Sequence, residues 1–122
     1  MKLKKVIILV ENTAQTSERW ARALKGRALK KTRGSAIISV PNWDVLGRIF
    51  SPPRLQILAA VLEHHPPSIA ALARRLKRDF KNVHADVTFL ADVGLLELRQ
   101  EGTRRALVPM PIYSEIDVPL AA

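Results

Sequence analysis

The stretch that decides the fold is Ser68–Gly94, SIAALARRLKRDFKNVHADVTFLADVG. It contains two amphipathic segments with a break near Lys77–Asp79. In both segments the apolar residues recur every three or four positions, the spacing of a helix face that is buried. These residues are Ile69, Leu72, Ala73 and Leu76 in the first segment, and Val83, Val87 and Leu90 in the second. We therefore predict two helices joined by a short turn, the second over residues 80–93.

Residues suited to helix ends flank these segments. Ser68 is a favoured N-cap residue, and Gly94 is suited to a left-handed C-cap. A further helix is predicted upstream, because Ser51-Pro52-Pro53 supplies a hydroxyl for the cap and prolines for the first turn. It should end at His64-His65-Pro66-Pro67, since a residue before proline disfavours the helical region. Its predicted buried face consists of Leu55, Leu58, Ala59 and Leu62.

A β-hairpin is predicted after Gly94. Leu96–Arg99 alternates with period two, Glu101-Gly102 is a turn signal, and Arg105–Val108 forms the return strand. Three helices followed by a hairpin are typical of a winged helix-turn-helix, which places its third helix in the major groove of DNA. Ile112–Leu120 is predicted as a half-buried C-terminal strand with its apolar residues on one side.

The N-terminal third has its own pattern of strand, helix and strand. Lys4–Val10 and Ala36–Val40 are predicted strands, and Ser17–Leu29 is a predicted helix in which Trp20, Leu24 and Ala28 form one stripe. A short helix capped by Asn42 or Asp44 should follow and run through Phe50. The predicted fold class is therefore α+β. We expect an N-terminal β-α-β arm over residues 1–44 and a winged helix-turn-helix domain with a C-terminal strand over residues 45–122.

Positive charge is concentrated in two regions of the chain. The formal net charge of the 122 residues is +9, and the isoelectric point is about 10.7. Residues 1–34 carry +8 and residues 68–90 carry +3, whereas the rest of the chain sums to −2. Clustered positive charge attracts polyanions, so a nucleic acid is the predicted partner. The alternatives are an anionic membrane and an acidic protein.

Other features bound the location and the chemistry. There is no cysteine, which excludes disulfides and thiolate sites. The apolar run Val6–Val10 is far shorter than the about 20 residues of a membrane span and is also short for a signal peptide. We therefore predict a cytoplasmic protein with no membrane association.

The outward side of the predicted second helix of the pair is suited to base contacts. If Val83 points inward, Lys81 and Ala85 point outward at about 100° per residue, and His84 lies on a flank. Lysine suits phosphate or guanine, asparagine suits adenine, and alanine allows close approach or contact with a thymine methyl group. The predicted DNA-reading residues are Arg78, Lys81, Asn82, His84, Ala85 and Thr88. The predicted backbone and wing contacts are Ser68, Arg74, Arg75, Lys77, Arg99, Arg104 and Arg105. Phe89 should lie beside this face and is assigned to packing against a partner or the arm.

Four quoted segments carry a resemblance to a known family. They are Ser51-Pro-Pro-Arg-Leu-Gln-Ile-Leu, Pro67-Ser-Ile-Ala-Ala-Leu-Ala-Arg-Arg-Leu, Arg78-Asp-Phe-Lys-Asn-Val-His-Ala-Asp-Val and Gly94-Leu-Leu. Over about Val45 to Leu120 the chain resembles MarR-like winged helix-turn-helix regulators. It is similar in particular to small prokaryotic predicted transcriptional regulators, some of them antitoxin-like. The resemblance implies a DNA-binding homodimer that represses transcription, often of its own operon. It also implies that His84 and Ala85 touch DNA, although the second position is often larger and basic in the family.

An enzyme is not predicted. His64 and His65 lie in a turn bounded by prolines and lack a third metal ligand at a fixed spacing. The scattered acidic residues are Asp44, Glu63, Asp79, Asp86 and Asp92. Among these, Asp79 is a predicted helix cap and Asp86 a predicted partner of a nearby arginine. There is no phosphate-binding glycine loop and no nucleophile motif, so neither a cofactor nor a metal is expected.

The role of the N-terminal arm stays open at this point. On its apolar side, Trp20 and Leu24 are expected to bury against a second copy or against the body of the protein, while its basic side suits phosphates that flank a DNA site. Both roles are compatible with each other.

The alternative function of the protein is that of an antitoxin. In this alternative, the arm or the C-terminal strand binds a partner toxin, with or without DNA binding.

Overall fold

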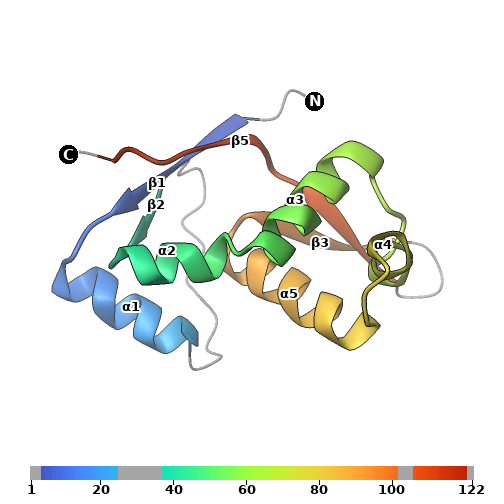
Figure 1. The fold of residues 1–122 in the computed structure, drawn as a ribbon, viewed down its shortest axis with the longest axis horizontal. Coiled ribbons are helices and arrows are strands. Elements are labelled where there is room, and N and C mark those ends of the chain that lie inside the picture. The colour runs from blue at the N-terminus through green and yellow to red at the C-terminus, as the bar shows by residue number, and fades with distance from the viewer. Residues whose placement is uncertain (1–3, 25–36, 102–105, 121–122) are drawn as a thin grey trace. The chain divides into compact units, whose positions relative to one another are not determined.

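The computed structural model describes residues 4–24, 37–101 and 106–120, and Figure 1 shows their arrangement. These residues form five helices and five strands, which confirms the α+β class. The chain divides into two units, Met1–Phe50 together with Tyr113–Ala122, and Ser51–Ile112. This division differs from the predicted boundary after residue 44, because the short helix before Phe50 and the C-terminal strand both belong to the N-terminal unit.

The N-terminal unit is built on a three-stranded parallel sheet. Strand β1 (Lys4–Val10) lies in the centre, between β2 (Ile37–Val40) and β5 (Tyr113–Asp117). Helix α1 (Ala14–Leu24) connects β1 to β2, so the predicted strand-helix-strand order is confirmed. The helix begins three residues before the predicted start at Ser17, and the predicted continuation beyond Leu24 lies outside the described residues.

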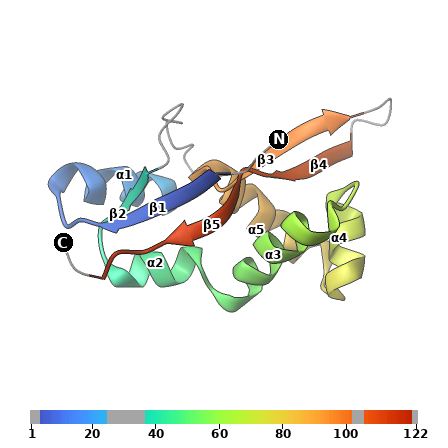
Figure 2. The same ribbon diagram turned by 90° about the horizontal axis from the view of Figure 1, so that it is seen from above.

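One face of this sheet is buried. Val6, Ile8 and Val40 are almost completely inaccessible, and the register places Ile8 beside Ile38 and Val10 beside Val40. Since side chains alternate along a strand, these residues share one face. Helices α1 and α2 (Trp43–Ile49) both contact β2 and lie on the same side of the sheet (Figures 1 and 2). The N-terminal unit therefore has two layers, with helices on one face.

Trp20 is the largest buried side chain of the N-terminal unit. Only 1% of it is exposed, and its indole N–H donates a hydrogen bond of 2.6 Å to the carbonyl oxygen of Ser39 in β2. The indole thus packs within its own chain and satisfies a backbone group of an edge strand. Of the two predicted packing partners of Trp20, a second copy and the body of its own chain, the structure bears out the second.

The C-terminal strand is shorter and more exposed than predicted. It covers Tyr113–Asp117 instead of Ile112–Leu120 and pairs in parallel with β1, with Val6 beside Ile116. Ile116 is 37% exposed and Leu120 is 82% exposed, so the predicted half-buried stripe is wrong at these positions. The reason is that β5 lies at the edge of the sheet, and Leu120 lies beyond the end of the strand.

The described residues of the second unit form three helices and a two-stranded antiparallel sheet. The helices are α3 (Pro52–His64), α4 (Ile69–Leu76) and α5 (Phe80–Val93). The strands β3 (Leu96–Glu101) and β4 (Ala106–Pro111) pair from Leu96 with Pro111 to Glu101 with Ala106. β4 contacts α3 and α4 while β3 contacts α5, so the strand pair packs against all three helices (Figure 2). The predicted span of α5, the left-handed Gly94 and the antiparallel strands are confirmed.

The core of the second unit follows the predicted pattern in α4 and α5 but not in α3. Val83, Val87 and Leu90 are completely buried. In α3, the buried residues are Ile57, Ala60 and Val61, and Leu55 is 43% exposed, so the predicted face is wrong. The run ILAAVL is apolar all round, and periodicity alone does not choose between its faces.

We expect Trp20→Phe to lower the free energy of unfolding by about 1–3 kcal/mol, because it leaves the Ser39 carbonyl without its indole donor. Denaturant unfolding followed by circular dichroism measures this change. Trp43→Phe is the matched control, since Trp43 is half exposed, and should change stability by less than about 0.5 kcal/mol. Equal effects of the two substitutions would contradict the assigned role of Trp20.

Candidate nucleic-acid interface

The connection between α4 and α5 is short and is held by backbone hydrogen bonds. Ser68 caps α4, with its hydroxyl oxygen accepting a 3.0 Å bond from the Ala71 N–H. Lys77 ends the helix in the left-handed conformation, at φ 54°, and its N–H donates to the carbonyls of Ala73 and Arg74. Arg78 N–H donates to the Ala73 carbonyl over 3.1 Å. These bonds satisfy the last carbonyls of α4 and reverse the chain within Lys77–Asp79.

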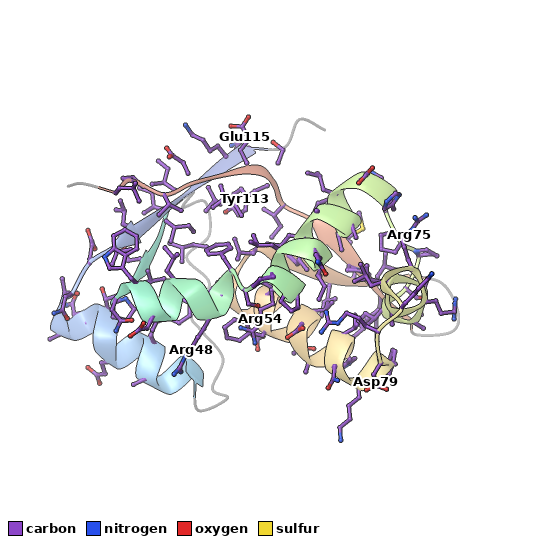
Figure 3. All side chains as sticks on the ribbon, in the orientation of Figure 1. Arg48, Arg54, Arg75, Asp79, Tyr113 and Glu115 are labelled. Atoms are coloured by element: carbon purple, nitrogen blue, oxygen red, sulfur yellow. The ribbon has the colours of Figure 1, made fainter. Side chains whose placement is uncertain are left out.

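Asp79 lies at the N-cap position of α5 without capping it through its side chain. Its carbonyl accepts the hydrogen bond from the Val83 N–H, but its carboxylate makes no cap bond, so the predicted side-chain cap is wrong. Ser51 likewise precedes α3 without a side-chain cap bond. The Asp79 side chain is exposed at the start of α5 (Figure 3).

A carboxylate between two guanidinium groups fixes α5 in the second unit. Asp86 Oδ1 accepts a 3.2 Å hydrogen bond from Arg54 Nε, and Asp86 Oδ2 accepts a 2.8 Å bond from Arg78 Nη2. The three side chains are between 18% and 25% exposed. Arg54 belongs to the first turn of α3 and lies between α3 and α5 in Figure 3. The predicted pairing of Asp86 with an arginine is confirmed, and it involves two of them.

This network changes the interpretation of two predicted residues. Arg78 lies in the turn before α5 and not on that helix, and one of its nitrogens is bound to Asp86. Its role is therefore to hold the turn. The Arg54 guanidinium also stacks over the Phe89 ring, 4.0 Å from the centroid, so Phe89 packs against a side chain of α3. Helical periodicity could not show this contact, because Arg54 is far away along the chain.

The outward side of α5 carries most of the predicted DNA-reading residues. Lys81, Asn82, His84 and Ala85 are exposed, and Thr88 is half-buried. Val83 and Val87 hold the opposite side of the helix in the core. The structure therefore brings a cation, an amide, an imidazole and a small residue together on the first two turns of one helix.

Phe80 is an exposed residue of this site that the sequence analysis missed. It is 51% exposed, and its ring lies 5.7 Å from the His84 ring, measured between centroids. Phe80 lies three residues before Val83 and seven residues before Val87, and this spacing favours a buried position. Only the exposure of the first turn of α5 distinguishes Phe80 from the core residues.

The residues predicted to contact the DNA backbone have different surroundings. Arg74, Arg75 and Lys77 are exposed at the end of α4 and in the turn. Ser68 is engaged in its cap, and Arg99 on β3 donates to Glu97 over 3.0 Å on the same strand. Arg104 and Arg105 lie outside the described residues. Within the described part of the second unit, the exposed cations are thus concentrated on α4, the turn and the start of α5.

Within residues 4–24, 37–101 and 106–120, no group of three or more histidine, aspartate or glutamate side chains is placed to hold a metal ion. His65 is the left-handed C-cap residue of α3, which agrees with the predicted turn. No single helix in these ranges is long and apolar enough to cross a bilayer, and α2 and α3 meet that criterion only when taken together.

The comparison with known families places the chain in one of them. The model of the HVO_A0114 family matches residues 49–118, more than half of the chain, and the protein belongs to this family. The match spans the whole second unit and β5, and the family description names no activity. No curated protein and no solved structure matches the chain. The resemblance to MarR-like regulators stays a prediction.

We expect Asp86→Ala to lower the free energy of unfolding by about 1.5–3 kcal/mol, because two partly buried arginines lose their charged acceptor. Asp92→Ala on the exposed side of the same helix is the matched control and should have an effect below about 0.5 kcal/mol. Urea unfolding of both variants measures the difference. A stable Asp86→Ala protein would show that the arginine network does not hold α5.

Proposed function

We propose that this protein is a sequence-specific regulator of transcription that binds double-stranded DNA. The second unit acts as a winged helix-turn-helix of the MarR-like kind, with α3, α4 and α5 as its helices and β3–β4 as its wing. In this proposal α5 enters the major groove and α4 lies across the phosphate backbone.

The single observation that carries the proposal is the separation of the two sides of α5. Val83, Val87 and Leu90 are fully buried, while Lys81, Asn82, His84 and Ala85 are exposed. Lysine, asparagine and histidine offer hydrogen-bond donors to base edges and phosphates, and alanine lets the helix approach closely. A helix of this composition at the surface of a basic unit matches the requirements of a reading helix.

Charge supports the same partner. The second unit has nine basic and six acidic residues, and Arg54 and Arg78 are occupied by Asp86. The exposed cations Arg74, Arg75 and Lys77 precede α5, which adds Lys81. Cations that lie on successive turns in this way are suited to neutralise the phosphates of the duplex backbone.

The proposed regulator acts as a homodimer on an inverted repeat. The family resemblance implies this, and the half-sites should be centred about 34–36 Å apart or at a multiple of that distance. The apolar surface available for self-association is smaller than the sequence predicted, because Trp20, Val6 and Ile8 are buried within their own unit.

The proposed function is tested by selecting duplexes from a random library with the full-length protein and measuring affinity for the recovered site. We expect one recurrent site and a steep dependence on salt. With about 6–10 phosphate contacts per dimer, affinity should fall about 10³-fold or more between 50 and 200 mM salt. Recovery of no common sequence, with an affinity that is flat across this range, would overturn the proposal.

Substitutions should separate reading from backbone binding. Lys81→Ala, Asn82→Ala and His84→Ala should lose about 1–3 kcal/mol of preference for the selected site over random duplex wherever a base contact is lost. Arg74→Ala with Arg75→Ala should weaken binding to both duplexes about equally, because phosphates are common to all sequences. Fluorescence anisotropy on the two duplexes measures both quantities. If the α5 variants keep the full preference, another element reads the sequence.

A further inference from the structure

Phe80 places a large apolar ring on the otherwise polar surface of α5. Its side chain is 51% exposed although the helix buries five other apolar residues. His84 lies one helical turn along, and the two rings are tilted by 43° at a centroid distance of 5.7 Å. This contact covers part of the Phe80 ring and limits its freedom, so the remaining surface of the ring is presented in a defined direction.

The neighbours of Phe80 indicate what this surface meets. Asp79 and Lys81 are exposed on either side of it along the chain, and Lys77 is exposed in the turn. The Asp79 carboxylate makes no cap bond, repels phosphates and only accepts hydrogen bonds. A carboxylate in this place favours the amino groups of bases over the backbone, whereas the lysines favour phosphates. The first turn of α5 is thus suited to the floor of a groove, with cations toward its walls.

The major groove offers one apolar group to a protein, the C5-methyl group of thymine. Residues at the N-terminal end of a recognition helix are the ones that contact base edges. We propose that Phe80, positioned by His84, contacts the C5-methyl group of a thymine and thereby selects that base. This inference rests on the proposed function, since it takes α5 to lie in the major groove.

The test uses duplexes in which single thymines of the selected site are replaced by deoxyuridine, which pairs like thymine but lacks the methyl group. Each half-site should contain one thymine that is sensitive to this change. A single replacement at that thymine should weaken binding by the full-length protein about three- to fivefold, as expected for one buried methyl group. Phe80→Ala should bind the thymine and deoxyuridine duplexes equally. Phe80→Leu should keep part of the discrimination, because leucine retains an apolar surface.

Leu55→Ala is the matched control, since Leu55 is an exposed apolar residue of the same unit, on α3. It should discriminate between the two duplexes like the unmodified protein. Circular dichroism verifies that each variant is folded. If the unmodified protein binds its site but tolerates deoxyuridine at every thymine, the assignment of Phe80 is overturned and the proposed function stands. Discrimination that persists in Phe80→Ala also overturns it. If no duplex is bound specifically, both proposals fail.

Discussion

The carboxylate of Asp86 lies within 3.2 Å of Arg54 and 2.8 Å of Arg78, and the direction of α5 depends on these two contacts. Arg54 comes from the first turn of α3 and Arg78 from the turn after α4, so one side chain on α5 connects all three helices. Apolar packing of Val83 and Val87 buries the helix but tolerates small rotations, whereas two charged hydrogen bonds specify one orientation. Arg54 adds a stacking contact with Phe89. The exposed residues of α5 are thereby held in fixed positions on the surface.

Charge is distributed differently in the two units. In the second unit the arginines that lie close to the core are bound to acidic residues, and the cations that remain exposed gather on α4 and at the start of α5. The N-terminal unit has eleven basic and five acidic residues, but six of those basic residues fall within stretches that the structure does not describe. Within the described part, its sheet buries one face beneath α1 and α2 and pairs the two ends of the chain through β1 and β5. The proposed role in DNA binding therefore rests on the second unit, and a role of the N-terminal arm in dimerisation or phosphate binding stays a prediction.

Local sequence patterns predicted the elements well, and contacts between distant residues were out of their reach. The spans of β1 and α5, the caps at Ser68 and Gly94, and the buried edge of Val83, Val87 and Leu90 follow from period and capping preferences. The buried face of α3 was wrong because its apolar residues surround the helix. The pairing of β5 with β1 joins strands about a hundred residues apart, which no local pattern encodes.

At the site, the exposure of Lys81, Asn82, His84 and Ala85 was predicted from their place opposite the core. The place of Arg78 in the turn and its pairing with Asp86 were not predicted for this residue, and its contact with DNA stays a prediction. Phe80 was missed because its spacing matches the core.

The central claim, that the exposed side of α5 meets DNA, is tested most directly by nuclear magnetic resonance of the isotope-labelled full-length protein with and without its selected duplex. The account predicts that the amide signals of Phe80–Ala85, and those of Arg74–Lys77 in α4 and the turn, change most on addition of the duplex. Signals of the exposed side of α3, such as Ala59, should change little. The largest changes in β1 and β5, with the signals of α5 unmoved, would contradict the account.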